Sequence, residues 1–161
     1  MNNDFRYLTK RDKSDLQKSK TFEALAAIAL RVLKRMHAKE QKKAHPREIG
    51  MVSGPISTGG FRSHHANITA FQKTIRWLEK KDYCIFSQMP FEKHMWRIME
   101  TPYYQSGEMQ LLTKFYRPIF ESGFVIIIHF MWNWRTSFGA QWEHKESKRL
   151  HIKRNYLSQA L

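Results

Sequence analysis

The chain has a single cysteine and no long apolar run. These two features exclude several kinds of site and several classes of protein. The single cysteine, Cys84, excludes a disulfide within the chain and a zinc site built from several cysteines. The longest apolar run, residues 124–132, is far shorter than the roughly 20 residues that a membrane-spanning helix needs. The N-terminus is polar and does not resemble a signal peptide. We therefore expect a cytoplasmic protein with no membrane contact, and we expect no metal and no cofactor.

Acidic residues are also scarce. The chain has 14 Asp and Glu against 28 Lys and Arg, which gives a net charge of +14. Residues 1–45 hold 12 of the basic and 5 of the acidic residues, so half of the excess lies in this part. Such a surplus attracts phosphate groups, although basic side chains also simply solvate helix surfaces. Charge alone leaves both interpretations open for the N-terminal part.

The first 45 residues divide into two segments. Residues 1–20 are polar and lack periodicity, which predicts a basic flexible arm or a short helix. In residues 21–45, apolar side chains recur every three or four positions, which predicts an amphipathic helix. Its apolar stripe favours packing on its own domain or on a second subunit over contact with nucleic acid or membrane.

Residues 46–161 alternate between strand and helix patterns. Strands are predicted at 48–53, 83–87, 124–131 and 152–157, and helices at 66–81, at 108–120 and from about 137, with Pro118 disturbing the second helix. Residues 88–108 lack a clear period and are expected to form a long loop over the site. The order predicts an α/β fold with an open, mostly parallel flavodoxin- or Rossmann-like sheet flanked by helices, plus an extra N-terminal helix. Residues 46–161 would form one nucleotide-binding domain.

Two short segments, residues 53–60 and 137–144, come directly after predicted strands. In an open parallel sheet, ligands bind beyond the carboxyl ends of the strands, where backbone amides and helix dipoles hold phosphate. Glycines in the first segment let the backbone bend close to a ligand. Neither segment has the spacing of a Walker loop or of a dinucleotide fingerprint. Together the segments indicate a nucleotide site.

The residues of both segments resemble a known family. The run 52–56, followed by Asn67 and Phe71, and the later run 134–144 are similar to two motifs of the nucleoside 2-deoxyribosyltransferase-like superfamily, especially its small uncharacterised bacterial and phage members. The resemblance covers about residues 48–157. It implies cleavage of the N-glycosidic bond of a nucleoside or nucleoside 5′-monophosphate, by hydrolysis or base transfer, in a homo-oligomer of two or more chains.

Within this resemblance, Glu143 would be the catalytic nucleophile. The substrate- and phosphate-binding positions would be Ser53, Gly54, Pro55, Ile56, Gly59, Gly60, Arg62, Arg135, Ser137, Gly139 and Ala140, with the two arginines assigned from their position alone. Active members of the superfamily carry an Asp near the start of the strand before the second motif, and here only Glu121 lies close by in sequence.

Several alternatives stay open. Glu143 is also compatible with an ordinary acidic residue on a helix surface. His64, His65 and His129 could each supply a proton near neutral pH. In the other interpretation, His64 and His65 are loop residues and His129 is a buried residue of a strand. The tryptophans at 132, 134 and 142 stack on a base or belong to a core or subunit interface. The alternative function is a non-catalytic nucleotide- or nucleic-acid-binding protein that uses the same pocket and the basic N-terminal arm.

Overall fold

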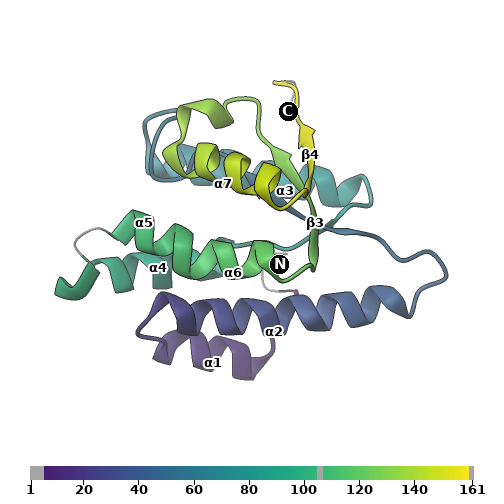
Figure 1. The fold of residues 1–161 in the computed structure, drawn as a ribbon, viewed down its shortest axis with the longest axis horizontal. Coiled ribbons are helices and arrows are strands. Elements are labelled where there is room, and N and C mark those ends of the chain that lie inside the picture. Colours follow the sequence, from purple (N-terminus) through teal and green to yellow (C-terminus); the bar gives the residue numbers. More distant parts are fainter. Residues whose placement is uncertain (1–5, 105–106, 160–161) are drawn as a thin grey trace. The chain divides into compact units, whose positions relative to one another are not determined.

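The computed structural model describes residues 6–104 and 107–159, and the chain forms two compact units whose segments alternate in the sequence. Unit 1 consists of Met1–Pro46 and Gln88–Phe124, and unit 2 consists of Arg47–Ser87 and Val125–Leu161. The elements of both units are labelled in Figure 1. The chain therefore leaves unit 2 after its second strand and returns to it at the third.

The described part of unit 1 is helical. Its elements are α1 (Lys10–Lys18), α2 (Phe22–Gln41), the 3-10 turn η2 (Met89–Phe91), α4 (Glu92–Met99), the 3-10 turn η3 (Pro102–Tyr104), α5 (Gly107–Leu111), the π-helical turn η4 (Leu112–Tyr116) and α6 (Arg117–Glu121). The apolar stripe of α2 is buried and packs against α1, η4 and α6. The predicted amphipathic helix is thus confirmed as a packed helix of its own unit.

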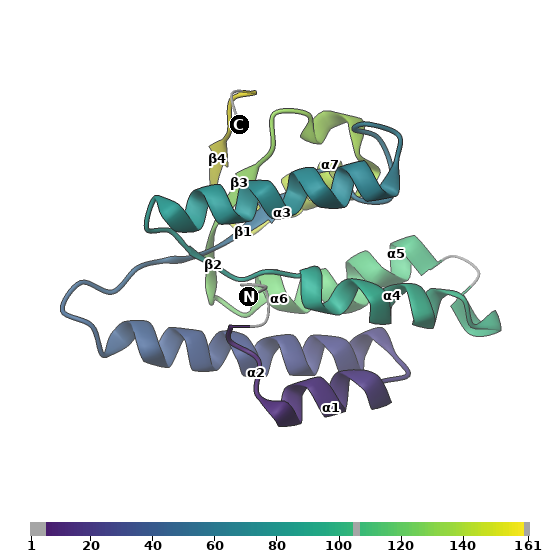
Figure 2. The ribbon, with the colours of Figure 1, turned by 180° about the vertical axis from the view of Figure 1, so that it is seen from behind.

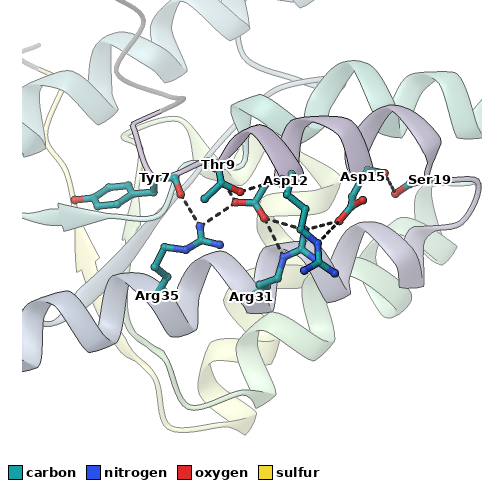
Figure 3. A network of polar contacts seen from close by, with 8 residues as sticks. Tyr7, Thr9, Asp12, Asp15, Ser19, Arg31 and Arg35 are labelled. Atoms are coloured by element: carbon teal, nitrogen blue, oxygen red, sulfur yellow. Dashed lines mark hydrogen bonds and ion pairs between the residues drawn. The ribbon is translucent and has the colours of Figure 1, made fainter.

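A buried carboxylate fixes α1 on α2 (Figure 3). Asp12 is fully buried, and its two oxygens accept hydrogen bonds from Arg31 Nε and Arg35 Nη1, both at 2.9 Å. Asp12 and Thr9 also cap each other's backbone amides at the start of α1. Burial alone would raise the pKa of Asp12, but these hydrogen bonds outweigh burial and lower the pKa to about 2. Residues 10–18 therefore form the short helix of the two predicted alternatives.

Unit 2 is a parallel α/β structure. Its elements are β1 (Ile49–Ser53), α3 (His64–Lys80), β2 (Cys84–Ile85), β3 (Val125–Phe130), the 3-10 turn η5 (Trp134–Thr136), α7 (Phe138–Arg149) and β4 (Lys153–Tyr156). The strands form one four-stranded sheet in the order β2-β1-β3-β4, and every neighbouring pair is parallel. This arrangement confirms the predicted open, Rossmann-like α/β fold, with the additional N-terminal helix present in unit 1.

The strand order reverses between β1 and β3. From β1 the chain passes through α3 to β2 on one side, whereas from β3 it passes through α7 to β4 on the other. Right-handed connections in opposite directions place their helices on opposite faces of a sheet. Accordingly, α7 lies nearer the viewer in Figure 1 and α3 lies nearer in Figure 2. The space beyond the carboxyl ends of β1 and β3 is therefore the topological switch point, where open α/β sheets bind ligands.

The segment 88–124 differs most from the sequence prediction. The expected long loop over residues 88–108 is wrong, because η2 and α4 bury Phe91, Met95 and Ile98 in a helical repeat. The division into units also differs from the predicted single domain over 46–161, since this segment packs with the first 46 residues. The helix predicted over 108–120 is interrupted by a π turn just before Pro118, whose missing amide removes one helical donor. Among the described helices, none has the length and apolar character needed to cross a bilayer.

Candidate functional site at the switch point

The loops that follow β1 and β3 meet at the switch point. The amide of Gly60 donates to Thr136 Oγ1 at 2.7 Å, and the amide of Phe138 donates to Thr58 Oγ1 at 3.2 Å. The two segments singled out in the sequence therefore lie together at the carboxyl edge of the sheet, as predicted. Thr58 and Thr136 make this contact, and the sequence gives no signal for their role because threonine is common in loops.

The glycines of the first loop allow close packing within the protein. Gly59 and Gly60 have φ angles of 69° and 60°, a region that side chains rarely adopt. A Cβ atom at Gly59 would collide with the backbone carbonyl of Thr136, and one at Gly54 would lie 2.5 Å from Met131 Sδ. Gly54 and Gly59 thus approach the segment after β3, whereas a Cβ atom at Gly60 would collide with Asn67 Oδ1. The absence of a side chain at each glycine allows a close contact within the protein, and an approach to a ligand stays a prediction.

Asn67 holds the first loop in shape. It lies in the first turn of α3 and is buried, and its Nδ2 donates to the carbonyls of Ile56 and Gly59, both at 3.2 Å. Its Oδ1 accepts from the amide of Phe61 at 3.0 Å. Asn67 was recognised in the sequence only as part of the family motif, and its contacts show that it positions the loop.

Glu143 lies on the inner side of α7 beside the end of β1. It is only 7% exposed, as is expected for a position that shares a helix face with the buried Ala140 and Ser147. The interpretation of Glu143 as an exposed surface residue is therefore wrong. Burial raises the pKa of Glu143 to about 8, and the nearby hydroxyl of Ser53 lowers it only in part.

The side chains of Glu143 and Ser53 each have a polar atom without a hydrogen-bond partner among the described residues. Ser53 is fully buried, and neither its Oγ nor Glu143 Oε2 has a partner of ordinary hydrogen-bond geometry within residues 6–104 and 107–159. Leaving a buried polar atom without a partner costs about 1–3 kcal/mol. Buried groups of this kind with shifted pKa values are common at functional sites.

Two of the predicted phosphate-binding groups at the start of α7 have partners within the protein. Ser137 is the N-cap, and its Oγ accepts from the amide of Ala140 at 3.2 Å, while the neighbouring amide of Phe138 donates to Thr58 Oγ1. Ala140 is buried and Gly139 is half-buried. A phosphate bound by the amide of Phe138 or Ala140 would therefore replace the contact of Thr58 or Ser137.

The remaining predicted binding residues belong to the loop after β1 and to the turn η5 after β3. Pro55 is buried and Ile56 half-buried in the first loop, where Arg62 is exposed with a φ angle of 56°. Arg135 is exposed, and its guanidinium lies 4.7 Å from the ring centre of Trp134. Arg135 thus faces a hollow formed by η5 and α7, which it lines together with Trp134, Gln141, His144 and Lys145.

The three histidines considered as proton donors differ in exposure. His64 and His65 are exposed at the start of α3. His129 is fully buried, and its Nδ1 lies 2.9 Å from Asn155 Nδ2. Burial lowers the pKa of His129 to about 4, so it stays neutral near pH 7. Glu121 is an exposed residue at the end of α6 in unit 1, whereas Glu143 belongs to unit 2.

The tryptophans also differ in environment. Trp134 is buried, Trp142 is half-buried, and Trp132 is 44% exposed.

Comparisons of the chain with family models, with curated proteins and with solved structures find no match. The geometry of the site and the motifs in the sequence are therefore what indicates a function for this chain.

Proposed function

We propose that unit 2 cleaves or exchanges the N-glycosidic bond of a nucleoside or nucleoside 5′-monophosphate, with Glu143 as the nucleophile. The observation that carries this proposal is the buried Glu143 carboxyl, which lies beside Ser53 at the switch point and has an oxygen without a partner among the described residues. The resemblance of both motifs to the deoxyribosyltransferase-like superfamily supports it. The resemblance also suggests an assembly of two or more chains, and the single cysteine favours a reducing compartment such as the cytoplasm.

The chemistry proceeds in two steps. A carboxylate oxygen of Glu143 forms a bond to C1′ while the bond from C1′ to the base nitrogen breaks. The electron pair of that bond leaves with the base, which takes up a proton from solvent. Water or a second base then attacks C1′, gives up a proton to solvent and releases the carboxylate, which gives hydrolysis or transfer.

The ionisation of Glu143 decides the pH dependence of this reaction. With a pKa of about 8, only about a tenth of the carboxyl groups are ionised in the ligand-free protein near pH 7. Because the nucleophile must be the carboxylate, we expect the rate at low substrate concentration to rise from about pH 6 to about pH 9.

The test is release of free base from a panel of nucleosides and nucleoside 5′-monophosphates, measured by chromatography. We expect Glu143→Gln to reduce turnover by at least about a hundredfold, because the amide cannot form the glycosyl ester. Glu146→Gln is the matched control, since Glu146 is equally buried on the same helix but pairs with Arg149 at 2.7 Å. Wild-type turnover by Glu143→Gln would contradict the proposal.

The alternative function would use the basic residues of the N-terminal part of the chain. Asp12 and Asp15 form ion pairs with Arg31 and Arg35, so these two of the 12 basic residues at positions 1–45 are held within unit 1. The net surplus of 7 already counts both carboxylates and is unchanged by the pairing.

A further inference from the structure

A second candidate site lies on the other side of α7 from Glu143. A hollow of about 320 Å³ is lined by Trp134, Arg135, Gln141, His144 and Lys145. Its α7 residues are exposed or half-buried, whereas Ala140, Glu143 and Ser147 are buried on the inner side of the helix. The hollow therefore does not include the proposed catalytic group. Its volume is at the lower end of the range for small-ligand pockets, about 300–1,000 Å³.

One wall of the hollow is a stack of aromatic rings. The rings of Trp134 and His144 lie 4.3 Å apart and are nearly parallel, at 25°. His144 Nε2 lies 2.7 Å from the hydroxyl of Tyr156, whose ring stacks on Phe130. These contacts hold Tyr156 on the edge strand β4, yet it stays 53% exposed. A rigid aromatic ring is thus presented to solvent beside the hollow.

The surroundings of the hollow are positively charged. Burial and the nearby Lys148, Arg154 and Arg135 lower the pKa of His144, so three cations act on this one ring. No ion pair joins Lys145 or Lys148 to another residue of the described part of the chain. The acidic residues of α7 do not offset this charge, because Glu143 is buried and Glu146 pairs with Arg149.

We propose that this basic aromatic hollow binds single-stranded nucleic acid. Arg135, Lys145, Lys148 and Arg154 would contact successive phosphates, and a base would stack on the exposed ring of Tyr156. A groove of cations combined with exposed aromatic rings is the arrangement by which proteins bind single strands without sequence preference. An acidic peptide would use the cations but would gain little from the aromatic ring, so the observations favour the nucleic acid.

The experiment measures fluorescence anisotropy of a labelled oligothymidylate of about 12 nucleotides with the full chain. The triple variant Lys145→Ala, Lys148→Ala, Arg154→Ala removes one cation that lines the hollow and two that act on its His144. The control Lys73→Ala, Arg76→Ala, Lys80→Ala removes three exposed cations of α3 and so changes the net charge equally. We expect at least about tenfold weaker binding for the first variant and less than about threefold for the second. All six positions are exposed, and thermal melting checks that both variants fold.

A second pair of variants tests the aromatic ring. Tyr156→Ala should weaken binding at least about fivefold, and Tyr156→Phe, which keeps the ring and loses the hydroxyl, should bind within about twofold of wild type. Equal effects of the two triple variants, displacement of the oligonucleotide by polyglutamate of matched charge, or no binding by the wild type would overturn the proposal. Glu143→Gln should bind like wild type, so this result is independent of the glycosidic activity.

Discussion

At the scale of single residues, the buried Glu143 should make the stability of the protein fall as the pH rises. Its pKa is raised from 4.5 in an unfolded chain to about 8 in the fold, so the folded state holds the proton more tightly. Stability is highest below about pH 4.5 for this group and is lost progressively between there and about pH 8. The full shift corresponds to roughly 5 kcal/mol, and relaxation around a buried charge makes this an upper limit.

Glu143→Gln should remove this loss, because the amide stays neutral. We expect its thermal midpoint to exceed that of wild type near pH 9 and to match it near pH 5. Glu92 has a pKa raised to about 7 by burial, but it titrates in both proteins and cancels from the comparison. A constant difference between the two melting profiles at all pH values would show that Glu143 is not held neutral by the fold.

Glycine at position 59 is needed for the contact between the two loops. Gly59→Ala combines a positive φ with a collision against the Thr136 carbonyl, and we expect a loss of about 3 kcal/mol in the free energy of unfolding. Gly123→Ala is the control, because Gly123 has a φ of 79° but a Cβ there would meet nothing within 4 Å. It should cost about 1 kcal/mol. Equal losses in urea denaturation would mean that the loop contact is dispensable.

At the scale of secondary structure elements, Asp12 joins α1 to α2. Asp12→Ala leaves Arg31 and Arg35 without their shared carboxylate. Breaking a buried ion pair costs about 3–5 kcal/mol, but these arginines are 35% and 28% exposed, so we expect about 2 kcal/mol. Asp15→Ala, which removes a partly exposed partner of Arg31, should cost less than about 1 kcal/mol.

The contribution of Asp12 to the stability of the protein should decrease at low pH. The pKa of Asp12 is lowered from 3.8 to about 2, so its contribution is complete above about pH 4 and is lost as the pH falls toward 2. The difference in unfolding free energy between wild type and Asp12→Ala should shrink over this interval in urea titrations. A difference that persists unchanged at about pH 2 would assign the effect to packing.

The elements that sequence periodicity predicts best are those that bury a regular stripe. Helix α2 falls close to its expected position for this reason. Strands β1 and β3 also lie close to their expected positions, because their residues form short, continuous runs that are mostly apolar. Helix α4 and the turn η2 before it carry an equally regular set, Phe91, Met95 and Ile98, but Pro90 and the absence of a side-chain cap conceal the start of the helix. Periodicity also cannot assign residues 88–124 to unit 1, because that grouping depends on contacts far apart in the sequence.

In the candidate site, too, the sequence predicts the local features but not the contacts between residues far apart in the chain. Strand order predicts that the two loops lie at one edge of the sheet, and helix geometry makes the inward position of Glu143 understandable once Ala140 and Ser147 are seen to be buried. The capping of Phe138 by Thr58 joins residues 80 positions apart, and no local pattern predicts it. For the same reason, the sequence gives no sign that the amides of Phe138 and Ala140 at the start of α7 already have partners.

At the scale of the whole molecule, the two units share the excess positive charge equally. Unit 1 contains 16 basic and 9 acidic residues and unit 2 contains 12 and 5, which gives each a surplus of 7. Such a surplus destabilises a compact state through repulsion among its own charges, and salt screens this repulsion. The repulsion reaches a shorter distance as salt is added, because the Debye length falls from about 10 Å at 0.1 M to about 3 Å at 1 M.

We therefore expect the thermal midpoint to rise when sodium chloride is increased from about 0.1 M to about 0.5 M, because repulsion between unpaired lysines extends farther than the short ion pairs of Asp12. Calorimetry at both sodium chloride concentrations measures the shift. A midpoint that falls with sodium chloride would mean that attraction within ion pairs outweighs the repulsion between the remaining charges.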